Sequence, residues 1–111
     1  MWQFLSHLTQ AARQCYHLNR HIKGRHKFSA SETKTISKIQ EMLSIMENAY
    51  VSKDIHPLMR VHGLEQEVVY DRRKELLTAK DPVVGYYLLS LARVMYLANS
   101  PLTGVISLEA L

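Results

Sequence analysis

Apolar residues recur at steps of three and four along most of the chain, a spacing that places them on one side of an α-helix. Four such segments cover about residues 2–23, 29–51, 58–79 and 81–98, with neither an internal repeat nor a low-complexity linker between them. The pattern therefore predicts an all-α fold: a helical bundle of about four helices that forms a single domain, residues 1–111.

The first two predicted helices each carry an apolar face. On the first helix this face consists of Trp2, Leu5, Leu8, Ala12, Cys15, Leu18 and Ile22. On the second helix it consists of Ile36, Ile39, Leu43, Met46 and Tyr50. The second face has the regular spacing of a seam shared by two packed helices. We therefore expect the first two helices to form an antiparallel hairpin.

Local signals mark where the helices begin and end. Gly24 is a stop signal for the first helix, because glycine readily adopts the left-handed conformation. Ser29 and Glu32 have the spacing of a capping box at the start of the second helix. Asp81 and Pro82 are a cap and a first helical residue for the last helix.

Other residues predict interruptions. Pro57 disfavours helix at the preceding residue, so it separates the second helix from the third. Gly63 predicts a possible irregularity within the third helix. The segment "NSPLTG", residues 99–104, predicts the end of the last helix near Ala98. Residues 105–111 would then be a short apolar tail that packs on the bundle or on a second subunit.

The third helix places charges on its apolar face. That face is centred on Val61, Leu64, Val68 and Leu76. Glu65, Arg72 and Glu75 fall on the same side, where an unpaired charge would be very costly. We expect Arg72 to form a salt bridge with Glu75 or Glu65, and a polar pocket is the functional alternative.

The run "VVGYYLLSLARVMYLA", residues 83–98, is apolar on almost every side. It is shorter than the ~20 residues that a transmembrane helix needs, and it contains Arg93. We therefore interpret it as a buried core helix and expect no transmembrane segment. A helix this apolar needs cover from more than one direction, which predicts a homodimer; the alternative is that the other helices enclose it.

Composition agrees with a small globular protein. The chain has 111 residues, of which 47% are hydrophobic, and only four Gly and three Pro, too few for the many turns of an all-β fold. Cys15 is the only cysteine, so no internal disulfide forms, and a reducing, cytoplasmic location is expected. No secretory signal is evident; the alternative of a mitochondrial presequence rests on an amphipathic start without acids before Glu32.

Positive charge is concentrated in the first third of the chain. Residues 1–40 contain seven Lys and Arg but only one acid, whereas the rest contains seven Lys and Arg and nine acids. The candidate anion-binding residues at the predicted hairpin tip and along the first helix are Arg13, Arg20, Lys23, Arg25, Lys27 and Lys34. Such a patch binds nucleic acid or an acidic protein, or is simply solvated.

His17 and His21 are one helical turn apart and could share a metal ion. A zinc site needs three or four ligands, and no acid precedes Glu32 to complete one. We therefore expect no metal site here, and surface histidines are the simpler interpretation.

The segment "RHIKGRH", residues 20–26, matches the pattern R-[N/D/H]-x4-H. It resembles the ribonuclease signature of HEPN domains, small all-α bundles that often dimerise. The resemblance covers seven residues and implies that Arg20 and His26 form a catalytic pair acting on RNA, with His21 in the variable polar position. In that family the motif usually lies on a helix late in the domain, whereas here it lies in the N-terminal third.

Motifs of the common enzyme classes are missing from the sequence: it has no nucleophile elbow, phosphate-binding loop or recognisable carboxylate pair. We therefore expect a small non-enzymatic binding or regulatory protein, an adaptor or inhibitor that acts on a protein partner and needs no cofactor. Two alternatives stay open: nucleic-acid binding through the basic hairpin tip, and a HEPN-like ribonuclease.

Overall fold

The computed structural model describes residues 1–109, and the predicted all-α class is confirmed: every regular element in that range is helical. The elements are α1 (Trp2–Ile22), α2 (Ala30–Ser52), a 3-10 turn η1 (His56–Leu58), α3 (Met59–Gln66), a π-helical segment η2 (Glu67–Asp71), α4 (Arg73–Leu77) and α5 (Pro82–Glu109). No helix in residues 1–109 is long and apolar enough to cross a membrane.

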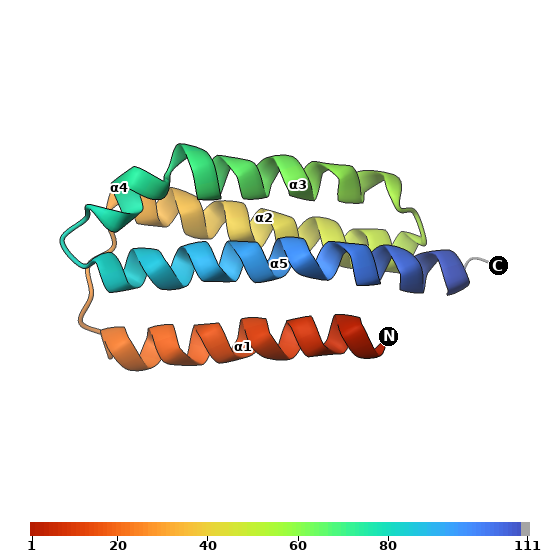
Figure 1. Cartoon of the computed structure of the whole chain (residues 1–111), viewed down its shortest axis with the longest axis horizontal. Helices are drawn as coiled ribbons and strands as arrows, with labels where there is room; N and C mark the ends of the chain where they lie inside the picture. Colours follow the sequence, from red (N-terminus) through yellow and green to blue (C-terminus); the bar gives the residue numbers. More distant parts are fainter. Residues whose placement is uncertain (110–111) are drawn as a thin grey trace.

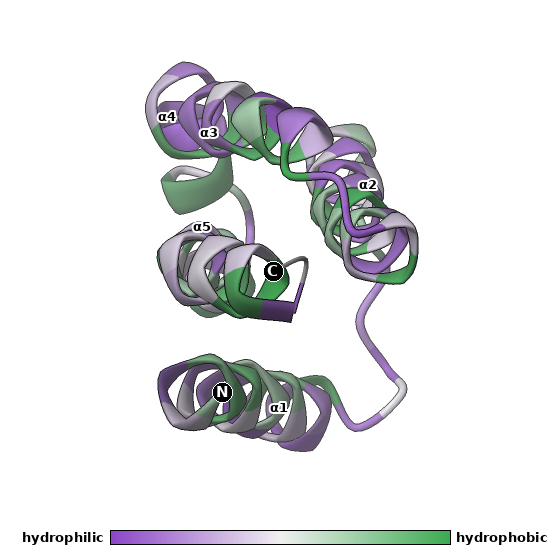
Figure 2. Ribbon diagram, turned by 90° about the vertical axis from the view of Figure 1, so that its right-hand side faces the viewer, coloured by the Kyte–Doolittle hydropathy of each residue, from purple (hydrophilic) through white to green (hydrophobic). Residues whose placement is uncertain are grey.

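α5 is the central helix of the molecule, and the other helices run beside it (Figure 1). In the view along the helices, α1 lies on one side of α5, while α3 and α4 lie on the opposite side and α2 lies to the right (Figure 2). All four of these helices contact α5. This two-sided cover accounts for the apolar character of α5 within one chain, so the predicted homodimer stays a prediction that the fold itself does not require.

The core follows one broad face of α5. The residues of α5 that are buried are Val84, Gly85, Leu88, Ala92, Met95, Ala98, Leu102, Val105 and Ile106. Only a strip that includes Tyr86, Arg93, Leu97 and Gly104 is exposed. Helices from the two sides of α5 therefore share one continuous hydrophobic core.

Three predicted helix ends are confirmed. Ser29 and Glu32 form a complete capping box: the Ser29 hydroxyl accepts from the Glu32 N–H, and the Glu32 carboxylate accepts from the Ser29 N–H at 2.8 Å. α1 ends where Lys23 and Gly24 both have positive φ. Asp81 caps α5 by accepting from the Val83 N–H at 3.1 Å.

The predicted end of the last helix near Ala98 is wrong, because α5 continues through Pro101 to Glu109. A proline inside a helix costs about 3 kcal/mol, since it removes one backbone hydrogen bond and crowds the preceding turn. Leu102 and Ile106 are buried beyond it, and each such side chain contributes roughly 1.5–3 kcal/mol. Tertiary burial thus outweighs the local cost. Of the predicted tail, residues 110 and 111 lie outside the described residues.

The third predicted helix is divided at a different place from the one expected. Gly63 lies in regular helix, whereas the backbone widens into a π-helical turn at η2. This turn ends at Arg72, after which α4 begins. The apolar face is buried as predicted, and Glu65 is buried with it at 1% exposure. Its ion-pair partner is Arg93 of α5, at 3.2 Å, and not Arg72. The expected Arg72 salt bridge is absent from the described part of the chain.

The predicted packing of the first two helices against each other is not confirmed. α1 and α2 run in opposite directions, but α1 packs along α5 and makes almost no contact with α2 (Figures 1 and 2). The side of α1 that meets α5 includes Phe4, Ala11 and Leu18. His17 stacks on Tyr87 of α5, and His21 is hydrogen-bonded to Asp81, the residue that precedes α5.

Gly85 allows a close approach between α5 and the end of α4 at Leu76, and this approach generates a stability prediction. A Cβ added at Gly85 would lie 2.3 Å from the Leu76 carbonyl oxygen, so Gly85→Ala is expected to destabilise the fold by about 1–3 kcal/mol through overpacking. Gly104→Ala, on the same helix but with open space around it, is the matched control, expected to stabilise by about 0.5–1 kcal/mol. Urea unfolding followed by circular dichroism measures both; equal effects would contradict the close approach.

Candidate functional site

An apolar concave surface lies between α1 and α2, with α5 as its floor. We call it the α1–α2 groove; its volume is about 450 Å³. It is lined from α1 by Leu8, Ala11, Ala12, Cys15, Leu18, Asn19 and Ile22. The remaining lining residues are Phe28, Ile36, Ile39, Gln40, Leu43, Leu88, Leu91 and Met95. Among them only Asn19 and Gln40 carry polar amides, so the groove is predominantly apolar.

The walls of this groove are largely the apolar faces that were expected to pack together in a hairpin. Cys15 and Ala12 of the α1 face are exposed, and Leu43 of the α2 face is 50% exposed. α2 instead buries a face turned partly away from the predicted seam, with Thr35, Met42 and Ala49 inside. The sequence pattern therefore predicted which residues of α1 and α2 form apolar faces, but not that parts of these faces line an open groove.

The loop that connects α1 to α2 closes one end of the groove, and a single buried carboxylate holds it. Glu32 is 2% exposed, and its Oε1 atom lies 3.0 Å from His26 Nε2 in addition to accepting from the Ser29 N–H. His26 also packs edge-on against Phe28, with ring centroids 4.9 Å apart. Glu32 thus positions the loop so that Phe28 lines the groove.

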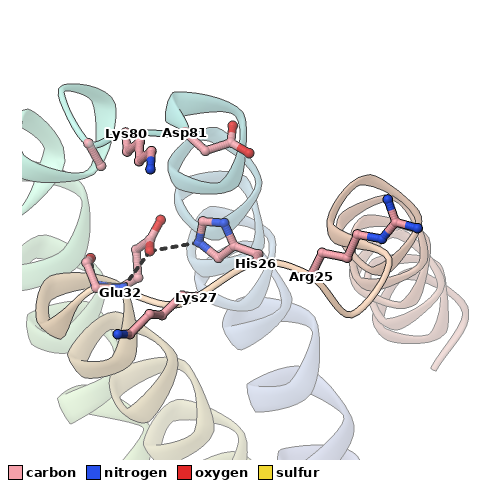
Figure 3. A pocket seen from close by; sticks show the side chains of 8 residues that line it. Arg25, His26, Lys27, Glu32, Lys80 and Asp81 are labelled. Atoms are coloured by element: carbon pink, nitrogen blue, oxygen red, sulfur yellow. Dashed lines mark hydrogen bonds and ion pairs between the residues drawn. The ribbon is translucent and has the colours of Figure 1, made fainter.

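A second concavity, the loop pocket, lies beside this carboxylate and has a volume of about 470 Å³. Figure 3 shows His26 and Glu32 joined in its centre, with Lys80 and Asp81 on the far side. Arg25 and Lys27 extend away from Glu32 in different directions (Figure 3). The Oε2 atom of Glu32 is buried without a hydrogen-bond partner in the described residues, so this pocket suits a water molecule or a small donor group.

Two exposed carboxylates carry histidine partners that shift their titration. His21 Nε2 lies 2.8 Å from Asp81, and this hydrogen bond lowers the pKa of Asp81 from its ordinary value. A hydrogen bond from His56 lowers the pKa of Asp54 in the same way. The first pair links the end of α1 to the start of α5, which helps keep α1 beside α5 rather than beside α2.

The candidate metal pair is divided between these contacts. His17 stacks on Tyr87 with centroids 6.4 Å apart, while His21 is bonded to Asp81. No group of three or more His, Cys, Asp or Glu side chains within residues 1–109 has a metal-binding arrangement.

The predicted anion-binding residues are distributed over α1, the connecting loop and α2, and the described residues bring them into no single pocket. Arg13 and Arg20 are exposed on α1, and Lys34 is exposed on α2. Lys23 and Lys27 belong to the connecting loop, beside the groove residues Ile22 and Phe28. Arg25, also in this loop, and Lys27 line the loop pocket. Within the described chain, none of the six cations forms an ion pair with an Asp or Glu carboxylate.

The two residues of the ribonuclease-like motif lie in different environments. Arg20 is exposed on α1 and does not line the loop pocket. His26 is partly buried, and its Nε2 atom is engaged by Glu32. Comparison of the chain with protein-family models, curated proteins and solved structures finds no match.

The engagement of His26 generates a prediction about the loop. His26→Ala leaves the buried Glu32 carboxylate with one partner fewer, so a loss of about 1–3 kcal/mol in unfolding free energy is expected. His56→Ala is the matched control, because it removes a histidine from an exposed carboxylate pair and should cause no measurable loss. Chemical denaturation at neutral pH compares the two. Equal stability of both variants would show that His26 does not hold the loop.

Proposed function

We propose that this protein is a small non-enzymatic binding protein that engages a helical segment of a protein partner in the α1–α2 groove. The observation that carries the proposal is the pair of apolar helix faces that border the groove without packing on each other. Contiguous apolar surface of this kind is typical of interaction sites. An amphipathic helix is the element that fits such a groove, through apolar side chains at steps of three and four.

The length of the groove sets the size of the segment. Its lining on α1 runs from Leu8 to Ile22, which corresponds to about 21 Å at 1.5 Å per residue. A helix of about 14 residues, or four turns, matches this length. Seated between α1 and α2 on α5, it would complete the closed bundle of packed helices that the sequence pattern suggested.

Homodimerisation is a related proposal with a weaker basis. The apolar α5 that motivated it is covered by helices of its own chain, as described above. Binding of a second copy in the groove would appear as a dimer in which Cys15 is protected without added peptide.

The groove itself provides the test. Leu43→Asp places a charge on its wall, where a bound helix would have to bury that charge, so binding is expected to fall by more than tenfold. Leu97→Asp is the matched control: Leu97 is 43% exposed, close to the 50% of Leu43, and lies outside the groove. The ligands are helical peptides of about 14–16 residues, selected on the protein from a displayed library with an apolar stripe. Selection that yields no peptide sensitive to Leu43→Asp would reject the proposed function.

Cys15 provides an independent reading of occupancy. It is the only cysteine, it is exposed, and it lines the groove wall. A peptide in the groove should slow its modification by a maleimide, whereas a peptide bound elsewhere should leave the rate unchanged.

Nucleic-acid binding through the basic residues of α1 and the loop is the second candidate function. Its supporting observation is that Arg20, Lys23, Arg25 and Lys27 are exposed and unneutralised by carboxylates within residues 1–109. Free cations of this kind suit phosphate groups. They suit acidic side chains equally well, so the salt response of binding has to separate the two.

If these four residues contact phosphates, the logarithm of affinity for labelled duplex RNA or DNA should fall against the logarithm of salt concentration with a slope of roughly −3 to −4. Removing one cation should reduce the slope by about one without changing sequence preference. Fluorescence anisotropy between about 50 and 300 mM salt measures it. No binding at low salt, or a flat response, would rule out this second function.

A further inference from the structure

We infer that the helix bound in the α1–α2 groove is an acidic amphipathic helix, with its Asp and Glu side chains at the end that faces the loop residues Lys23, Arg25 and Lys27. This inference rests on the proposed function and adds the chemistry of the partner. It depends on where the unneutralised cations lie relative to the apolar lining.

The three cations are adjacent to the groove in the chain. Lys23 directly follows Ile22, and Lys27 directly precedes Phe28, both of which line the groove. Arg25 lies between them, in the same loop. All three are exposed and have no carboxylate partner in the described chain. A helix end placed in the groove at Phe28 therefore lies next to a loop that carries three positive charges, with Arg25 and Lys27 extending in different directions from it (Figure 3).

Hydrogen bonds hold the backbone of the loop that carries these three cations. Glu32 holds His26 at 3.0 Å and the Ser29 N–H at 2.8 Å, so both halves of the loop are tied to the start of α2. At the other end, the Lys23 N–H donates to Asn19, which ends α1. A ligand therefore loses less affinity to ordering the loop than it would on a flexible segment.

The carboxylates near these cations are already engaged by other partners. Asp81 lines the loop pocket together with Arg25 and Lys27, but it is bonded to His21. Residues 1–31 contain no acid, and the first acid, Glu32, is buried and already engaged by His26 and Ser29. Like charges across an interface are costly, while a complementary acidic surface favours both specificity and rapid association. An occupant with acids at this end is thus selected over a neutral or basic one.

The same charge distribution disfavours the first helix of a second copy. α1 has an exposed apolar face, but its only charged residues are Arg13 and Arg20, so inserting it would add positive charge beside the three loop cations. A nucleic acid would satisfy the cations but would leave the apolar walls exposed. Only an acidic helix satisfies both the walls and the loop.

The test is a selection from a peptide library in which the charge of the bound peptides is not fixed in advance. Displayed peptides of about 16 residues carry leucine at steps of three and four, and all the remaining positions are randomised. Peptides are selected on the wild-type protein, and those lost with Leu43→Asp are kept as groove ligands. We expect these ligands to be enriched in Asp and Glu at one end, to protect Cys15 from maleimide, and to lose affinity as salt rises.

The matched variants locate the charge effect. The triple variant Lys23→Gln/Arg25→Gln/Lys27→Gln should weaken the selected peptides by about tenfold, since each partly exposed ion pair contributes modestly. The triple variant Arg72→Gln/Arg73→Gln/Lys74→Gln removes the same formal charge at α4, across α5 from α1 (Figure 2), and should leave affinity within about twofold. In parallel, selection on the loop variant should show no acidic enrichment.

Each contrary outcome has a distinct meaning. Groove ligands without acidic enrichment, or equal affinity for the wild type and the loop variant, would overturn the acidic partner while leaving the proposed function intact. Failure to obtain any ligand that protects Cys15 would overturn the proposed function itself. Sedimentation that reveals a dimer with Cys15 protected in the absence of peptide would assign the groove to a second copy. RNA binding that displaces the peptides and is lost in the loop variant would assign the cations to phosphate, and would likewise overturn the inference.

Discussion

Burial of α5 from two sides is the constraint on which the rest of this structure depends. The helix is apolar over most of its circumference, and water can be excluded from such a surface only if other helices approach it from several directions. α1 meets it on one side, while α2, α3 and α4 meet it on the others. The same demand keeps the helix continuous beyond Pro101, because Leu102 and Ile106 gain more from burial than the proline costs. It also requires the absence of a side chain at Gly85, where the Leu76 carbonyl lies closest.

Placing α1 on α5 leaves α1 and α2 apart, and this separation produces the groove. An aromatic contact and a hydrogen bond reinforce the placement: His17 stacks on Tyr87, and His21 bonds to Asp81. The hydrogen bond with His21 lowers the pKa of Asp81 from its ordinary value of 3.8. The contact therefore stabilises the fold fully at pH values above 3.8, where the carboxylate is ionised in both the folded and the unfolded chain. This contribution is lost as the pH falls through the lowered pKa. The groove is therefore a consequence of how the core is assembled, and its apolar walls remain available to a partner.

Glu32 joins the local structure of α2 to the proposed binding surface. Its carboxylate completes the capping box of α2 and at the same time holds His26, which brings Phe28 to the groove and leaves the neighbouring cations exposed. A buried carboxylate is stable only with hydrogen-bond donors, so the loop conformation and the burial of Glu32 depend on each other. This coupling explains why an acid that looks like an ordinary helix cap also shapes a surface several residues away.

The sequence by itself determined the elements that depend on neighbouring residues. The capping box at Ser29 and Glu32, the stop at Gly24 and the start at Asp81 follow from backbone chemistry within one turn, and so does the all-α class that follows from the apolar spacing. Only the tertiary structure decided which apolar face is buried. An apolar stripe on α1 or α2 indicates that another helix must cover it, but not which helix does so. Packing of the other helices on α5 leaves Leu43 and Cys15 at an open groove and pairs Glu65 with Arg93 instead of Arg72. The same packing keeps α5 helical through Pro101. Each of these outcomes depends on contacts between residues far apart in the chain. A local sequence pattern does not indicate the relative free energies of burying such residues.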